Sequence, residues 1–113
     1  TYGRLSEEAY FARQTLAEAG ISVDFLKITR LVPVADGIYE ICKQYQHVLF
    51  YEEGIRNGGL GQLLLNGLYE RGFGGKFQLH AIDGFVPHGK IYELLADLEL
   101  DRAAMIRDVK MLQ

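Results

Sequence analysis

The sequence of 113 residues has one cysteine, two prolines and no tryptophan. The single cysteine, Cys42, cannot form a disulfide within the chain, and the low count favours a reducing compartment. No apolar run approaches the roughly 20 residues of a membrane-spanning helix. The 12 Lys and Arg are outnumbered by 15 Asp and Glu and form no basic cluster. We therefore expect a cytoplasmic globular domain that contacts neither a membrane nor a nucleic acid.

Glycine, in contrast, is abundant, with 13 residues, and indicates several tight turns between regular elements. Apolar residues recur every three or four positions in some stretches and alternate in others, which are the periods of helices and strands. The predicted order is a helix over 5–19, a strand over 21–25, a short helix from Asp36, a buried strand over 48–51, a helix over 60–68, a strand over 77–81, and short helices near 91–95 and after Asp101.

This alternation predicts one α/β domain over residues 1–113, a three-layer α/β/α sandwich with a small, mostly parallel sheet of three strands. The continuously apolar run over 48–51 fits a strand that is covered on both faces. Ser6 and Asp101 have the side chains that cap helix N-termini. Pro33 predicts a loop over 31–34, and Cys42 falls on the apolar face of a helix, as a core thiol would.

The turn Gly58-Gly59-Leu60-Gly61 lies between a predicted strand and a predicted helix, where open α/β sheets bind ligands. Its spacing matches neither the dinucleotide fingerprint nor the P-loop. The glycines therefore indicate a tight turn and close helix packing. Arg56 and Asn57 beside the turn keep a second hypothesis open, contact with a phosphate.

Glu52 and Glu53 do not form an acid/base pair, because neighbours on a strand point to opposite faces. We expect one to be exposed and the other to cap a helix or pair with a neighbour such as Arg56; a substrate or interface contact is the alternative. His47, His80 and His88 are not spaced as metal ligands, and His88, in a Pro-Gly loop, is the best functional candidate among them.

Five segments together resemble the C-terminal domain of transketolase-like, thiamine-diphosphate-dependent enzymes. They are Thr1-Tyr2-Gly3, Gly20-Ile21-Ser22-Val23, Leu31-Val32-Pro33, residues 48–53 and the turn at 58–61. The closing segment, with Val86-Pro87-His88-Gly89, Leu94-Leu95, residues 98–101 and Met105, resembles the end of the 1-deoxy-D-xylulose-5-phosphate synthases. The resemblance implies an enzyme that condenses pyruvate with glyceraldehyde 3-phosphate and acts as a homodimer.

The resemblance also implies which parts lie outside this chain. In that family an N-terminal domain holds thiamine diphosphate and a divalent metal such as Mg, and a middle domain supplies the activating glutamate. We therefore expect a fragment of a three-domain chain that is inactive alone, with no catalytic, cofactor or metal residues of its own. Its partners would be the N-terminal and middle domains and a second subunit.

Two sets of residues receive roles on this basis. Some members of the family carry an arginine about where Leu95 stands here, so Lys90 and Arg102, by charge and location, are predicted to contact a substrate phosphate instead. A structural turn or interface role is predicted for Glu52, Glu53, Gly58, Gly59, Gly61 and His88. The alternatives are the same domain of another transketolase or of a 2-oxoacid dehydrogenase β-type enzyme, and a stand-alone anion-binding module that uses the glycine turn.

Overall fold

The computed structural model describes residues 1–84 and 90–113, and within them two strands and five helices alternate as an α/β domain. Most elements lie where the periodicity of the sequence predicts them. In chain order they are α1 (Leu5–Glu18), α2 (Asp36–Cys42), β1 (His47–Ile55), α3 (Leu60–Glu70), β2 (Lys76–Ile82), α4 (Ile91–Asp97) and α5 (Arg102–Lys110).

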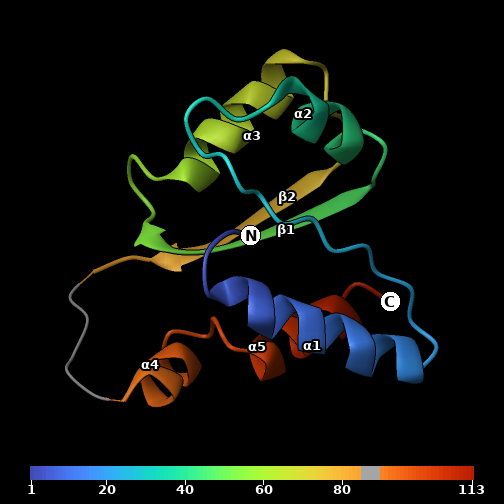
Figure 1. Cartoon of the computed structure of the whole chain (residues 1–113). Coiled ribbons are helices and arrows are strands. Elements are labelled where there is room, and N and C mark those ends of the chain that lie inside the picture. The colour runs from blue at the N-terminus through green and yellow to red at the C-terminus, as the bar shows by residue number, and fades with distance from the viewer. Residues whose placement is uncertain (85–89) are drawn as a thin grey trace.

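The two strands form a parallel sheet between two layers of helices. His47 lies opposite Lys76 and Tyr51 opposite His80, and the register becomes irregular before Ile55. Helix α3 connects β1 to β2, as a parallel pair requires. Figure 1 shows α2 and α3 on one face of the sheet and α1, α4 and α5 on the other. The three-layer arrangement with a small parallel sheet is therefore confirmed.

The strand expected over 21–25 is wrong, because β1 and β2 are the only strands in the described residues. The alternating pattern is present, but a strand needs a neighbouring backbone to complete its ladder. This stretch of chain passes the N-terminus instead, where the amino group of Thr1 donates to Leu26 O at 3.2 Å and Ile28 N donates to Thr1 O at 2.9 Å.

The core has one part on each face of the sheet, because successive residues of a strand point to opposite sides. Phe50 packs with Leu64 and Leu68 of α3 and with Tyr39 of α2. Tyr51 packs on the other side, in the cluster that holds Leu5, Ala12, Leu95, Leu100 and Met105. Cys42 is buried in the first cluster, which confirms its prediction as core.

The helix ends agree with the sequence in part. Asp101 Oδ1 accepts a hydrogen bond from Ala104 N at 3.0 Å, so the predicted cap of α5 is confirmed. Ser6 is not a cap, since α1 begins at Leu5 and Ser6 lies buried inside its first turn. The expected loop over 31–34 is confirmed and contains a cis Val32–Pro33 bond.

None of the helices in residues 1–84 and 90–113 is both long enough and apolar enough to span a bilayer.

Candidate functional site

The carboxyl end of β1, where the strand turns into α3, is the place where open α/β sheets usually bind ligands. The strand ends at Ile55 and α3 begins at Leu60, so the glycine turn joins them in four residues. Gly58 has a φ of +79°, a left-handed conformation that glycine adopts without strain. The predicted position of the turn, between a buried strand and a helix, is therefore confirmed.

Glu52 is the central residue of this edge and is only 1% exposed. Its Oε1 accepts a hydrogen bond from Gly61 N at 3.1 Å, and its Oε2 accepts one from the Tyr2 hydroxyl at 3.0 Å. The carboxylate thus caps the N-terminus of α3, where unpaired N–H groups and the helix dipole favour a negative charge. The position that an anionic ligand would take is filled by the chain's own carboxylate.

The glycines beside Glu52 are required by space. A Cβ on Gly59 would lie 2.4 Å from Ile55 O and 2.6 Å from Glu52 Oε1. A Cβ on Gly61 would lie 2.2 Å from Leu79 Cδ1. Gly58 N donates to Gln62 Oε1 at 3.0 Å, so a second N–H of the turn also has a protein partner. These contacts favour the packing interpretation of the turn over the phosphate interpretation.

Burial of Tyr2 and its hydrogen bond to Glu52 raise the pKa of the Tyr2 phenol to about 12. Burial is the larger cause, followed by the hydrogen bond and the charge of Glu52. The phenol therefore stays protonated near neutral pH and keeps donating to the buried carboxylate. The sequence indicates Tyr2 only as part of a segment that carries the family resemblance, because only the fold brings it within reach of a residue 50 positions away.

The charged residues around the turn pair differently from the sequence prediction. Arg56 does not pair with a glutamate, because its Nε lies 2.5 Å from Asp83 Oδ1 at the end of β2 and its Nη1 donates to Leu79 O at 2.9 Å. Glu53 instead pairs with Arg4, Nε to Oε1 at 2.5 Å, on the opposite side of the strand from Glu52. The two glutamates therefore diverge, as the alternation predicts.

Arg102, predicted to contact a phosphate, is held by other groups. Its Nε donates to Glu8 Oε2 at 2.6 Å, its backbone N donates to the same oxygen at 3.1 Å, and its guanidinium lies 4.5 Å from the centre of the Phe11 ring. Glu8 is buried, so this ion pair joins α1 to α5. The geometry weighs against Arg102 as a free phosphate ligand.

Lys90 is exposed and immediately precedes α4, and its predicted contact with a phosphate stays a prediction. His88 lies outside the described residues. His47 begins β1 and is exposed, whereas His80 lies within β2.

His80 belongs to a partly buried polar cluster that the sequence analysis missed. Its ring stacks on Tyr51 at 4.5 Å, and the Tyr51 hydroxyl donates to Asp108 Oδ2 at 2.7 Å. Arg107 Nη2 lies 3.0 Å from Asp108 Oδ1. Burial lowers the pKa of His80, so the ring is neutral near pH 7 and makes no ion pair with Asp108. The cluster ties α5 to the sheet; its only sequence signal is polar residues on apolar strands.

The fold defines the class of this domain, and comparison with known proteins identifies its family. The model of the family "Transketolase, C-terminal domain" matches residues 1–105. The chain belongs to this family.

The relatives and the structural neighbour agree with that assignment. The chain is 28% identical over 95% of its length to the 1-deoxy-D-xylulose-5-phosphate synthase of Clostridium tetani, and 30% identical over 96% to that of Corynebacterium jeikeium. It spans 18% of the length of each relative. A solved structure titled "Split gene transketolase, inactive beta4 tetramer" matches with a TM-score of 0.81 at 17% identity, over 97% of this chain and 35% of the other.

The residues present do not fit the thiamine diphosphate and metal ion that enzymes of this family use. In the described part of the chain, no three His, Cys, Asp or Glu side chains come together to hold a metal ion. The glycine turn faces the carboxylate of Glu52, which would repel a diphosphate. This edge of the sheet is built to hold its own elements together.

Proposed function

We propose that the chain is the C-terminal domain of a thiamine-diphosphate-dependent synthase that condenses pyruvate with glyceraldehyde 3-phosphate, giving 1-deoxy-D-xylulose 5-phosphate and CO2. The observation that carries the proposal is similarity to such synthases along 95% of the chain. Within the enzyme, the domain has a structural and dimer-forming role. Thiamine diphosphate and Mg would be bound by the N-terminal domain of the longer chain, and the activating glutamate would come from its middle domain.

The geometry at the carboxyl end of β1 supports a structural role. The Glu52 carboxylate accepts hydrogen bonds from Gly61 N and the Tyr2 hydroxyl, and Glu53 forms an ion pair with Arg4 on the other face. A pair of acid and base groups must converge on one reacting bond, and these two carboxylates diverge. Residues 52–61 thus stiffen the domain and leave chemistry to other parts of the enzyme.

The surface of α3 supports a contact with another domain or subunit. Tyr69 is 79% exposed and Leu63 52% exposed, and Ile55, at the end of β1, is 64% exposed. Large apolar side chains that are exposed favour burial against a partner. We expect these side chains to be buried against another domain or subunit in the assembled enzyme. The cytoplasmic location stays a prediction.

The proposal is tested by expressing the complete reading frame that encodes the chain. Supplied with thiamine diphosphate, Mg, pyruvate and glyceraldehyde 3-phosphate, the product should release CO2 and form 1-deoxy-D-xylulose 5-phosphate. The same preparation given two sugar phosphates and no pyruvate is the matched control, and ketol transfer between them would instead indicate a transketolase. A reading frame that ends near this length would contradict the proposal.

The stand-alone anion-binding module is tested separately on the 113-residue chain. Because Glu52 already occupies the helix N-terminus, we expect calorimetric titration with phosphate or thiamine diphosphate to show no micromolar binding. Glu52→Gln is the matched variant, since it removes the repelling charge and keeps the shape. Micromolar binding of phosphate to the unaltered chain would favour the module.

A further inference from the structure

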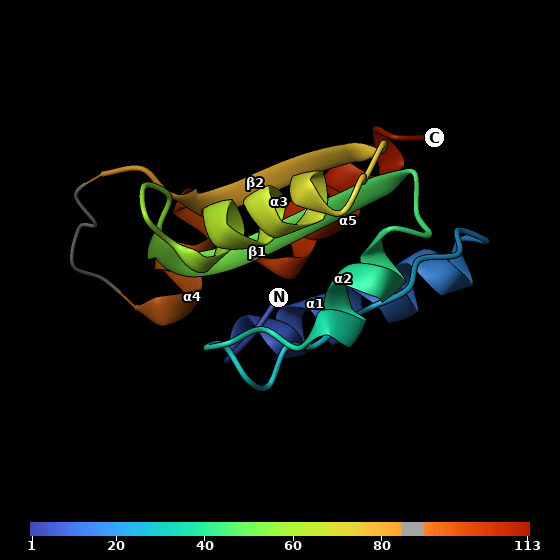
Figure 2. The ribbon, with the colours of Figure 1, turned by 90° about the horizontal axis from the view of Figure 1, so that it is seen from above.

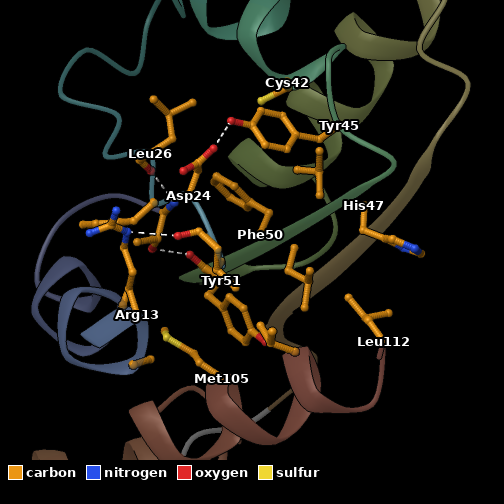
Figure 3. A pocket seen from close by; sticks show the side chains of 18 of the residues that line it. Arg13, Asp24, Leu26, Cys42, Tyr45, His47, Phe50, Tyr51, Met105 and Leu112 are labelled. Carbon is orange, nitrogen blue, oxygen red and sulfur yellow. Dashed lines mark hydrogen bonds between the residues drawn. The ribbon is translucent and has the colours of Figure 1, made fainter. Parts of the chain in front are cut away.

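Helix α5 lies on the face of the sheet opposite α3, and its polar contact with the sheet runs through Asp108. Figures 1 and 2 show the two helices on opposite faces of β1 and β2. Figure 3 shows Phe50 on one side of β1 and Tyr51 on the other, towards Met105 of α5. Within the part of the chain that the structure describes, the bond from the Tyr51 hydroxyl to Asp108 Oδ2 is the only side-chain hydrogen bond between α5 and a strand. The polar attachment of α5 to the sheet therefore depends on this carboxylate.

His80 lies against this contact without a hydrogen bond for its buried nitrogen. It is opposite Tyr51 in the register of β1 and β2, and the two rings stack with their centroids 4.5 Å apart. Its Nε2 is buried, has no hydrogen-bond partner among the described residues, and lies 3.7 Å from Asp108 Oδ2. The side chain is 26% exposed, so protons from solvent can reach the ring. Histidine is the side chain whose charge changes most readily near neutral pH.

The groups around His80 oppose an added proton while α5 lies on the sheet. Burial is the largest influence and lowers the pKa of the ring, against the attraction of Asp108. The guanidiniums of Arg56 and Arg107 lower the pKa further, and the more distant Glu99 raises it. Asp108 and Arg107 belong to α5, Glu99 to the loop before it, and Arg56 to the turn after β1. Asp108 Oδ1 already accepts from Nε and Nη2 of Arg107, at 3.2 and 3.0 Å.

Movement of α5 away from the sheet would remove the main obstacles to protonation. Water would reach His80 Nε2, and Arg107 would leave the neighbourhood of the ring together with its helix. Helix α5 has nine residues, whereas β1 and β2 are paired from His47 to Tyr51 without a break. A short helix on one face opens at a lower free energy than the central strands, so α5 is the element that gives way.

We propose that His80 is a proton-sensitive latch for α5: the neutral ring allows the helix to lie on the sheet, and a proton taken up from solvent favours the open helix. Because the pKa of the ring is lowered only while α5 is docked, the open state binds more protons. The open state therefore gains as the pH falls below the ordinary histidine value of about 6.5. One proton limits the gain to about tenfold for each pH unit.

The test measures hydrogen exchange of backbone amides in the 113-residue chain at pH 7.5 and pH 5.5. Each rate is divided by the intrinsic rate of an unprotected amide at the same pH. We expect the protection of α5 to fall about three- to tenfold relative to that of α3. Helix α3 is the internal reference because it lies on the other face of the sheet, and a loss of stability shared by the whole domain cancels in the ratio.

Two variants remove the titrating group, and a third is the matched control. His80→Phe keeps an aromatic ring against Tyr51 but takes up no proton, so its α5 protection relative to α3 should be the same at both pH values. His80→Gln should behave likewise, and the result then does not depend on how phenylalanine packs. His47→Gln replaces an exposed histidine at the start of β1 and should keep the full response of the unaltered chain.

Three outcomes would overturn the proposal. Equal relative protection of α5 at the two pH values in the unaltered chain would show that the helix does not open in this range. A fall of the same size in both neutral variants of His80 would assign the opening to another titrating group. An NMR titration of the His80 ring with a midpoint at or above 6.5 would show that docked α5 does not oppose the proton. The latch belongs to the domain itself, so none of these results depends on which product the enzyme forms.

Discussion

The carboxyl end of β1 and the free edge of the same strand differ in how completely their polar groups and space are used. At the carboxyl end, Glu52 accepts from Gly61 and Tyr2, and Gly59 leaves no room for a Cβ. Along the free edge, where β1 pairs with no strand in residues 1–84 and 90–113, backbone and apolar side chains border a cavity of about 590 Å³ (Figure 3). A turn that looks like a ligand site is closed, and an edge without a sequence motif is open.

The difference shows that glycine content and position are weak guides to binding. Glycines at a strand-to-helix turn serve equally to admit a phosphate or to admit a neighbouring side chain. Here the neighbour is the carboxylate of Glu52. An open backbone edge between two layers of helices, in contrast, leaves donors and acceptors that need partners in whatever sequence it occurs.

The largest expected effect comes from removing the carboxylate that fills the turn. Glu52→Ala leaves Gly61 N and the Tyr2 hydroxyl without their buried partner, and should lower the free energy of unfolding by about 3 kcal/mol. Glu53→Ala, which breaks only the ion pair with Arg4, should lower it by less than about 1 kcal/mol. Urea unfolding of both variants measures the difference. Equal losses in the free energy of unfolding would contradict the greater importance of the buried carboxylate.

The next effect concerns the open edge and its pH dependence. Burial lowers the pKa of the Thr1 amino group to about 6 in the folded chain, from about 8 when unfolded, so between these values the unfolded state binds more protons. Stability should therefore fall as the pH is lowered from 8 to 6, by up to about 2.7 kcal/mol for two pKa units.

N-terminal acetylation supplies the control for this pH dependence, because it removes the charge. Unfolding of the acetylated chain should be nearly flat over the same window. The pKa of His80 is also lowered by burial, so His80 adds a loss of the same sign only below its ordinary value of 6.5. An acetylated chain that keeps the full slope between pH 8 and 6 would show that Thr1 is not buried as described.

A third prediction concerns the space at the closed turn. Gly59→Ala should lower the free energy of unfolding by about 1–3 kcal/mol, because the new Cβ meets the backbone oxygen of Ile55, which cannot move aside. Gly37→Ala is the matched control, since a Cβ in α2 meets nothing within 4 Å and should stabilise the helix by about 1 kcal/mol. Thermal unfolding of both variants shows whether the first substitution destabilises the fold and the second stabilises it.

The smallest expected effect is at the end of the cavity that Tyr45 lines. Tyr45→Phe removes the hydrogen bond to Asp24 and should lower the free energy of unfolding by less than about 1 kcal/mol. Amides of the segment 22–27 should exchange faster, because the segment loses its tie to the loop between α2 and β1. Tyr69→Phe, on the exposed side of α3, is the control. Equal exchange in the two variants would mean that Tyr45 does not hold the segment 22–27 in place.

Much of the fold could be predicted because it depends on short-range patterns. The apolar stripe of α1 and the capping side chain of Asp101 act within one or two turns of helix. The same kind of local pattern predicts a strand over 21–25. This prediction is wrong because a strand must pair with a neighbouring strand, which an alternating sequence alone does not provide.

The site was harder to predict because its contacts join residues that are far apart in the sequence. Separation of Glu52 from Glu53 follows from strand alternation, but the partners Tyr2 and Gly61 could not be assigned before the elements were packed. The stack of Tyr51 on His80 likewise requires the register of β1 against β2, which the apolar pattern does not set.

The sequence by itself determined the class of fold, most of the helices and strands, and the family resemblance, since periodicity and local motifs are written in neighbouring residues. Only the tertiary structure decided that the glycine turn is filled by Glu52 and that the free edge of β1 borders a cavity. Both depend on contacts between residues far apart in the chain. Such contacts form when packing excludes water and leaves each buried polar group to find a partner within the protein.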